Sequence, residues 1–157
     1  MITFTHDNKK FTYRIAGVVI SNNAILFQKA VEDKYTFWFL PGGRAELSES
    51  AQETLKREMR EELDLDIKVE RLLWVVENFF DNGKFLVHEL GLYFLMTFPE
   101  DAHIYSQGTL FEREHAGDHL VFEWLPIDSL ATASLYPSFL KKVLHALPDR
   151  TQHLVHT

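Results

Sequence analysis

The sequence predicts a single layered α/β domain, and three observations support this fold class. The chain has 157 residues, the usual size of one domain with one hydrophobic core. Helical segments are embedded among apolar, β-branched runs that read as strands. No internal repeat, low-complexity run or linker divides the chain. We therefore expect one domain over residues 1–157, with residues 148–157 as a loose C-terminal tail.

The composition excludes several classes of function. The net charge of -7 argues against binding to nucleic acid polymers or anionic membranes, because both favour a basic surface. The chain has no cysteine, so it has neither disulfides nor thiolate chemistry. Its start has no apolar signal core, and the longest apolar run, at 90–98, is too short to span a membrane. We expect a cytoplasmic protein that acts on a small molecule, with a homodimer left open.

The N-terminal part is predicted to consist of strands. Residues 11–20, "FTYRIAGVVI", are β-branched and apolar, and "SNN" follows as a turn, so residues 24–30 should return as the second strand of a hairpin. A further short strand at 35–40 is ended by the loop-forming "PGG" at 41–43. This loop leads into the main helix.

The main helix follows this loop and continues through Leu63. Ser48 or Ser50 can cap its N-terminus, and Glu49 and Glu53 lie near its first turn. No glycine or proline interrupts the segment. This is the best-defined helix in the sequence.

The C-terminal part should contain a long hairpin and a second helix. The apolar runs 65–80 and 84–98 are joined by "DNG", a turn sequence that favours an antiparallel pair. Three further segments follow: a polar irregular stretch at 99–118, a last strand at 119–127 and an amphipathic helix at 136–147.

Two carboxylates of the main helix lie on or beside its apolar face, and a third lies close to them. With about 100° between successive residues, one stripe must face the core and comprises Ala51, Leu55, Met59 and Leu63. Glu58 and Glu62 fall on or beside that stripe, and Glu61 lies close to them. A charge run that only solvates a helix would instead occupy the far side, where Arg60 and Glu53 point.

This placement favours a metal site. Carboxylates without a partner beside the core would be costly or would take up protons, and carboxylate oxygens are hard ligands of the kind that Mg²⁺ prefers. The alternative is a set of ion pairs at the helix edge, in which Glu58 and Glu62 pair with the neighbouring cations Arg57, Arg60 or Lys56.

From Gly43 the sequence reads "GRAELSESAQETLKREMREELDL", which resembles the Nudix box, Gx5Ex7REUxEExGU with U a bulky aliphatic residue. Only the last glycine departs, because Asp64 stands there. The preceding "WFLPGG" and the surrounding strands are also similar to the Nudix family. The resemblance implies an α/β/α sandwich around a central mixed sheet. It further implies a divalent-metal-dependent pyrophosphohydrolase that cleaves a nucleoside diphosphate linked to another moiety.

The resemblance also implies roles for the box residues. The implied ligands of Mg²⁺, or of Mn²⁺, are helix carboxylates and a loop carbonyl: Glu58, Glu61, Glu62, and Gly42 or Gly43. Arg57 and Glu49 would orient these ligands as a pair. A water activated by the metal, and deprotonated by Glu58 or by a carboxylate outside the box, would attack phosphorus. Glu58, Glu62, Arg57 and Glu49 are thus the expected catalytic set.

The carboxylate outside the box has three candidates. Glu114 and Asp118 lie in the polar segment 99–118, from which family members often recruit such a residue. Glu89 shares a strand face with apolar residues and should point inward, where a charge needs a partner. The alternative for Glu89 is an ion pair with Arg14 or hydrogen bonding to nearby backbone. Arg14 is also expected to bind substrate.

The substrate class is only partly determined by the sequence. Phe79 and Phe80 are adjacent in a strand and point to opposite faces, so one should be core and the other free to stack on a nucleobase. The residues after the box that are typical of ADP-ribose and dinucleoside polyphosphate hydrolases are absent. Nucleoside triphosphates or nucleotide sugars remain as substrate classes.

A second hypothesis is a non-catalytic Nudix-fold module that binds or senses a nucleotide. The departure at Asp64, where a glycine can end the helix in a left-handed conformation, motivates it. Glu58, Glu61 and Glu62 are all present, and this favours hydrolysis, because a module without catalysis has no chemical need to keep them together.

Overall fold

The computed structural model describes all 157 residues. Its elements in chain order are β1 (Thr3–His6), β2 (Lys9–Val18), β3 (Ile20–Ser21), β4 (Ala24–Glu32), β5 (Tyr35–Phe39), β6 (Gly42–Arg44), α1 (Ala51–Leu63), β7 (Lys68–Asp81), β8 (Leu86–Thr97), η1 (His103–Ser106), β9 (Leu110–His115), β10 (Asp118–Pro126), η2 (Ile127–Thr132), α2 (Leu140–Val143) and β11 (Gln152–His156). None of the helices has the length and apolarity that crossing a membrane would require.

The strands form two sheets. The larger sheet has the order β1-β2-β8-β7-β11, with β6 also paired to β2, and the smaller has the order β3-β4-β10-β9, with β5 paired to β4. The pairs β2–β8 and β7–β11 are parallel and the other pairs of the larger sheet are antiparallel. The predicted mixed sheet is therefore confirmed.

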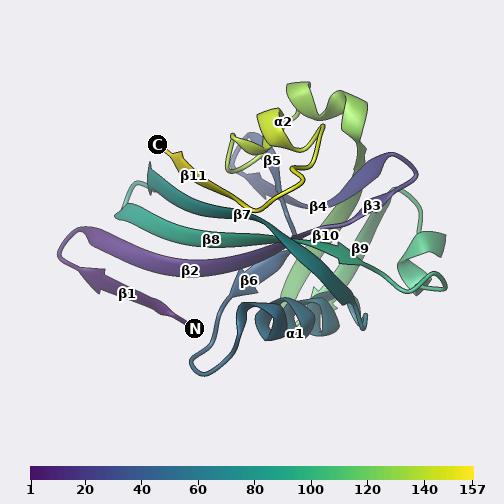
Figure 1. Cartoon of the computed structure of the whole chain (residues 1–157), viewed down its shortest axis with the longest axis horizontal. Helices are drawn as coiled ribbons and strands as arrows, with labels where there is room; N and C mark the ends of the chain where they lie inside the picture. Colours follow the sequence, from purple (N-terminus) through teal and green to yellow (C-terminus); the bar gives the residue numbers. More distant parts are fainter.

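Helical segments cover both faces of the sheet layer (Figure 1). Along β2, Ile15 packs into the core on the α1 side, and the next residue, Ala16, packs into a second core that includes Leu140 of α2. This alternation follows from the two-residue period of a strand. The predicted α/β/α sandwich is thus confirmed, with η2 and α2 as the thinner helical layer.

The first predicted hairpin is placed differently in the structure. Residues of β2 do not pair with β4, because β2 runs parallel to β8 along its whole length. Only the short strand β3 pairs with β4. Asn22 and Asn23 have positive φ values of 50° and 58°, the conformation of a tight two-residue hairpin turn. The chain therefore changes sheets between β2 and β3.

The segment 99–118 is more regular than the sequence suggests. It contains η1 and β9, and β9 pairs antiparallel with β10 along its whole length. The prediction of an irregular segment is wrong for β9. This strand was difficult to recognise because it lies at a sheet edge, where Phe111 is buried while Glu112 and Glu114 are exposed.

The C-terminal end also differs from expectation. The helix predicted over 136–147 is reduced to α2, because the backbone before it forms tighter bonds, such as Leu140 N–H to the Pro137 carbonyl. The prediction of a loose tail is wrong, since β11 pairs with β7. Side chains also fix the tail: Arg71 donates to the Pro148 carbonyl at 2.6 Å, and Thr151 donates to the Leu72 carbonyl at 2.8 Å.

Candidate active site

Helix α1 has well-defined caps at both ends. Ser50 is the N-cap, and it forms a capping box with Glu53, in which each side chain accepts a hydrogen bond from the other residue's backbone N–H. Ser48 is not the cap and has a positive φ of 65°. At the other end Asp64 is left-handed, with φ 54° and ψ 43°, and its N–H donates to the Arg60 carbonyl. Asp64 therefore adopts the conformation for which glycine is usual.

The carboxylates of α1 lie where the helical spacing predicts. The Glu58 side chain is only 14% exposed, whereas that of Glu61 is 41% exposed. Glu62 is half-buried, and its Oε2 atom is buried without any hydrogen-bond partner. Arg60 and Glu53 are exposed on the opposite side of the helix. Glu62 thus presents an unpaired carboxylate oxygen beside the core.

Arg57 joins the carboxylates into a network. Its Nε and Nη2 atoms donate to the two carboxylate oxygens of Glu49 at 2.8 and 3.1 Å. Its Nη1 atom donates to Glu58 at 2.9 Å and to Glu61 at 3.3 Å. The hydrogen bonds from Arg57 lower the pKa of Glu49 to about 2. The ion-pair alternative thus holds for Glu58 and fails for Glu62.

The loop at Gly42 and Gly43 approaches the helix too closely for any side chain. A Cβ atom on Gly43 would lie 2.2 Å from the Glu58 carboxylate, and one on Gly42 would lie 2.0 Å from the Ile15 carbonyl oxygen. Both glycines pair with β2. Their backbone is therefore held beside the carboxylates of α1, as the expected role of a loop carbonyl requires.

The same packing makes the ionised forms of Glu58 and Glu62 unfavourable when no cation is bound. Burial raises the pKa of Glu62 to about 8, and repulsion from Glu58 adds to this effect. Burial also raises the pKa of Glu58, although the hydrogen bond from Arg57 opposes it. No three acidic or histidine side chains gather into a ready-made metal site, and Glu61 is turned towards Arg57. The positive charge of Arg14 opposes this rise in the pKa of Glu62 without cancelling it, and no cation pairs with Glu62 directly.

These residues border a small cavity, which we name the carboxylate hollow. It has a volume of about 280 Å³, and its lining includes Arg14, Gly43, Arg44, Glu58, Glu62 and Glu89. A larger cavity of about 690 Å³ lies next to it and shares Arg14 and Glu89 with it. The two cavities therefore meet at Arg14 and Glu89.

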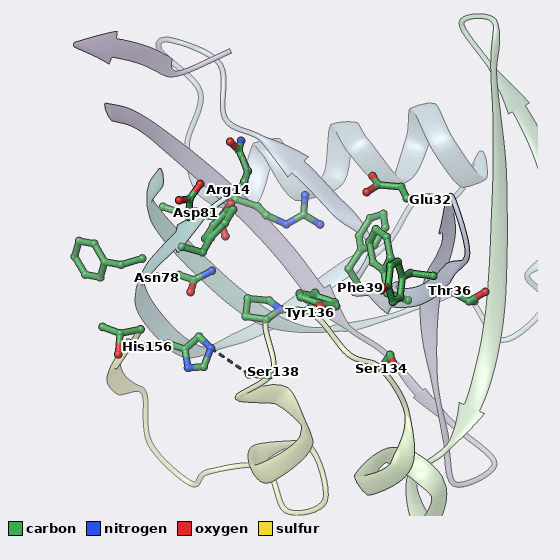
Figure 2. A pocket seen from close by; sticks show the side chains of 18 of the residues that line it. Arg14, Glu32, Thr36, Phe39, Asn78, Asp81, Ser134, Tyr136, Ser138 and His156 are labelled. Carbon is green, nitrogen blue, oxygen red and sulfur yellow. Dashed lines mark hydrogen bonds between the residues drawn. The ribbon is translucent and has the colours of Figure 1, made fainter. Parts of the chain in front are cut away.

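We name the larger cavity the aromatic pocket, after the rings in its wall (Figure 2). These rings come from β5, from β7 and from the segment before α2: Tyr35, Phe37, Phe39, Phe79, Phe80 and Tyr136. Phe79 and Phe80 are 38% and 42% exposed, so the prediction that one of them is core is wrong. Both lie near the end of β7, beyond the part of the sheet that the helices cover.

Arg14 is held in place between the two cavities. Its Nη2 atom donates to the Leu40 carbonyl at 2.8 Å, and its guanidinium lies 5.6 Å from the centre of the Phe39 ring. It forms no ion pair with Glu89, and the Glu89 carboxylate accepts no hydrogen bond from nearby backbone, so both alternatives for Glu89 fail. Figure 2 shows the Arg14 side chain extending into the pocket from β2.

The three candidate carboxylates outside the box lie in different places. Glu89 lies on β8, opposite Asn78 of β7, and borders both cavities. Glu114 is exposed on β9 and is hydrogen-bonded to His119, and Asp118 is exposed at the start of β10. Neither of these two residues lines a cavity that contains the box carboxylates.

Several residues of the aromatic pocket have no local pattern in the sequence that predicts their role. Asn78, Tyr136 and His156 come from β7, the segment before α2, and β11. His156 meets Asn78 because β11 pairs with β7, and Tyr136 is placed by its backbone N–H, which donates to the Trp38 carbonyl of β5; no local pattern predicts either contact. Among the pocket rings, the sequence singled out only Phe79 and Phe80, because aromatic residues in strands are more often core residues.

Comparisons with known proteins agree with this geometry. A NUDIX domain model matches residues 12–147. An 8-oxo-dGTP diphosphatase from Buchnera aphidicola subsp. Schizaphis graminum (strain Sg) is 29% identical over 140 residues, which are 88% of this chain and 94% of that protein. An 8-oxo-dGDP phosphatase from Danio rerio is 42% identical over 66 residues, 40% of this chain and 20% of that protein.

The fold is also similar to that of solved structures. The crystal structure of the mutator MutT protein from Bacillus halodurans superimposes with a TM-score of 0.61 at 22% sequence identity. The similarity covers 92% of this chain and 89% of that one. At this level of identity the comparison supports the fold alone.

Proposed function

This chain belongs to the Nudix family, and we propose that it hydrolyses nucleoside triphosphates to the monophosphate and pyrophosphate, with 8-oxo-dGTP as the first candidate substrate. As a Nudix pyrophosphohydrolase it acts on phosphoanhydride bonds. A relative that it matches over 88% of its length is an 8-oxo-dGTP diphosphatase, which makes this nucleotide a suitable first substrate to test.

One observation supports this proposal above the others: the carboxylate hollow and the aromatic pocket are adjacent, and Arg14 and Glu89 line both of them. A nucleotide has an aromatic base at one end and a charged phosphate chain at the other. With the base in the aromatic pocket, the phosphates extend past Arg14 towards Glu58 and Glu62. The positive charge of Arg14 suits a phosphate at the junction.

The carboxylate hollow fits a divalent cation, which the family typically uses. Glu62 has an unpartnered buried oxygen, Glu58 lies next to it, and Gly43 leaves space for a backbone carbonyl to approach. We expect Glu58, Glu62 and the Gly42 or Gly43 carbonyl to hold Mg²⁺, with Mn²⁺ as a substitute. Such an ion neutralises the pyrophosphate charge and activates a water. Glu61 can join when Arg57 releases it.

The remaining roles follow from the hydrogen bonds. Arg57 and Glu49 hold the Glu58 carboxylate in position, because the bidentate Arg57–Glu49 pair fixes the guanidinium that contacts Glu58. We assign the acceptance of a proton from the attacking water to Glu89, because it is the candidate carboxylate outside the box that lines both cavities. Glu58 is the second candidate for this base.

The distribution of charge favours a triphosphate over a nucleotide sugar. Arg44 lines the carboxylate hollow, where the leaving group would lie, and a pyrophosphate gains more from this cation than a neutral sugar does. The aromatic pocket carries the acidic residues Glu32, Asp33 and Asp81 on its wall. Negative charge there disfavours a second phosphorylated group and leaves the pocket to the base.

The non-catalytic alternative loses its motivation in the structure. Asp64 takes the left-handed conformation that a glycine would take, and Glu62 remains half-buried beside the core. The departure at Asp64 therefore does not remove a carboxylate from the carboxylate hollow.

A metal-supplemented hydrolysis screen tests the proposal. The purified protein is incubated with Mg²⁺ and 8-oxo-dGTP, the ordinary nucleoside triphosphates, UDP-glucose or ADP-ribose, and released monophosphate and pyrophosphate are quantified by chromatography. We expect cleavage of at least one triphosphate to monophosphate and pyrophosphate, abolished by a chelator. Cleavage of nucleotide sugars with no triphosphate hydrolysis would contradict the proposal.

A further inference from the structure

We propose that β11 forms a wall of the substrate pocket, and that His156, together with Asn78, determines which base the enzyme accepts. This inference rests on the proposed function, since it takes the aromatic pocket as the base site. His156 lies outside residues 12–147, the part of the chain that matches the family model.

Strand β11 is fixed to the domain. Residues 152–156 pair with β7 in parallel register, from Gln152 opposite Trp74 to His156 opposite Asn78. Leu154, on the same face as His156, packs against the second hydrophobic core. The hydrogen bonds of Arg71 and Thr151 hold the segment before the strand. The side chain of His156 therefore has a defined place in the pocket.

The aromatic pocket contains two polar side chains, Asn78 and His156, that lie next to each other. Asn78 is only 5% exposed, and its side-chain amide forms no hydrogen bond within the protein. Its neighbour across the sheet is His156, whose Nε2 lies 3.3 Å from the Ser138 hydroxyl and whose ring lies 5.6 Å from that of Phe139 (Figure 2). The His156 Nδ1 atom has no partner in the protein. Two polar side chains thus stand side by side with free hydrogen-bonding capacity.

Hydrogen bonds to the edge of the base, and not stacking on its face, distinguish one base from another. Stacking on Phe80 or Tyr136 tolerates any base, because every base has an aromatic face. The pattern of donors and acceptors on the base edge is what differs between bases. An amide offers one donor group and one acceptor, and a neutral imidazole offers one of each. A pocket with buried polar groups strongly disfavours a base that leaves them unpaired.

The acidic residues of the pocket are less suited to this role. Asp81 accepts a hydrogen bond from the Gly83 N–H at 2.8 Å, so its carboxylate is already engaged in the turn after β7. Glu32 and Asp33 are exposed at the end of β4. Asn78 and His156 are therefore the polar groups that we assign to base selection.

The experiment compares His156→Ala with His153→Ala in kinetic assays across a panel of nucleoside triphosphates. His153 lies on the same strand but outside the pocket, 2.9 Å from Glu77. For His156→Ala we expect the preference for the best triphosphate over the others to fall by about tenfold, the loss of one hydrogen bond. The change should appear in KM, with kcat within about twofold of wild type. Asn78→Leu should have a similar effect, and His156→Gln, which keeps a donor and an acceptor, should recover part of the preference.

Two outcomes overturn the inference. One is a wild-type preference in both His156→Ala and Asn78→Leu, at a thermal stability equal to that of His153→Ala. The other concerns binding, measured by NMR from the His156 imidazole signals during titration with nucleoside monophosphates. If these signals do not move although the enzyme binds the nucleotide, β11 is not part of the pocket.

The binding measurement separates this inference from the proposed function. If the wild-type protein hydrolyses no triphosphate, the proposed function fails. Movement of the His156 signals on addition of monophosphate would then still support β11 as the pocket wall, and unchanged signals would reject both.

Discussion

The carboxylate hollow and the aromatic pocket adjoin each other, but the chain builds them in opposite ways. The acidic side of the hollow comes mainly from one continuous segment, Gly43 to Leu63, in which a glycine loop leads directly into α1. The aromatic pocket collects residues from positions 14 to 157 of the chain. Local spacing thus defines the chemistry, and long-range packing defines the shape that meets the substrate.

The two regions also differ in electrostatics. In the carboxylate hollow, burial raises the pKa values of Glu58 and Glu62, so the folded protein bears a cost that a cation can remove. In the aromatic pocket, Phe79 and Phe80 are partly exposed and no comparable unpaired charge is buried. Substitutions in the hollow should therefore change catalysis and metal binding, and substitutions in the pocket should change affinity.

The largest effect is expected at the metal-binding carboxylates. Glu62→Gln or Glu58→Gln should lower kcat by about two orders of magnitude or more, because an amide is a poor replacement for an anionic ligand. The fold should survive, as measured by circular dichroism and thermal melting. A Glu62→Gln enzyme with wild-type turnover would show that the carboxylate hollow is not the metal site.

The second effect is a pH-dependent stability of the metal-free protein. The pKa of Glu62 is about 8 in the folded protein and lies above the ordinary value of 4.5, so the folded state holds this proton more tightly than the unfolded chain. Its contribution to the free energy of unfolding is present below about pH 4.5 and is lost as pH rises towards 8. We expect a loss of about 2 kcal/mol.

Denaturant titrations of metal-free protein between pH 5 and pH 9 test this. Mg²⁺ should restore the stability lost at high pH, and Glu62→Gln should flatten the profile. The pKa of Glu49, lowered to about 2, acts in the opposite direction and matters only as pH falls below about 4.5. An equally steep decline in Glu62→Gln would assign the effect to another group.

The third effect tests the junction between the two regions. Glu89→Gln should lower kcat by about a hundredfold or more, because a positioned general base contributes on this scale. Glu114→Gln and Asp118→Asn are matched controls that remove exposed carboxylates from the other sheet, and both should keep the wild-type rate. If Glu114→Gln or Asp118→Asn lowered kcat more than Glu89→Gln, the general base would lie on the β9–β10 hairpin.

The fourth effect belongs to the aromatic pocket. Phe80→Ala should raise KM by about tenfold with little change in kcat, since stacking on a base is worth about 1 to 3 kcal/mol. Phe79→Ala should raise KM less, because the Phe79 ring lies 4.4 Å from the His88 ring on the other face of the strand. Steady-state kinetics with several triphosphates provide the measurement. If both variants keep the wild-type KM, these rings do not contact the base, and Phe39 and Tyr136 become the better candidates.

The smallest effect is at the end of α1. Asp64→Gly should raise the free energy of unfolding by about 0.5 to 1 kcal/mol, because Asp64 has a left-handed conformation that glycine adopts without strain. The exposed ion pair with Arg60, 3.3 Å long, adds little. Thermal melting with unchanged activity would show that this position affects stability and not the carboxylate hollow.

The same contrast explains how much could be predicted from sequence. The helix, its buried stripe and the placement of Glu58 and Glu62 follow from a local period of 3.6 residues. The sequence also predicted the long β7–β8 hairpin, because its turn tripeptide gives a local signal. Strand β11 and the neighbours Asn78 and His156 depend on a parallel pairing between distant segments, for which the sequence contains no spacing rule.

The position of β11 has a further consequence for the behaviour of the protein in solution. It forms the outer strand of the larger sheet and pairs with part of the 14-residue strand β7, next to two partly exposed phenylalanines. Without β11, this part of β7 would present unpaired backbone groups beside Phe79 and Phe80, a combination that promotes edge-to-edge aggregation. Strand β11 therefore covers an edge of β7 that could pair with another chain. We expect a chain shortened before residue 152 to self-associate.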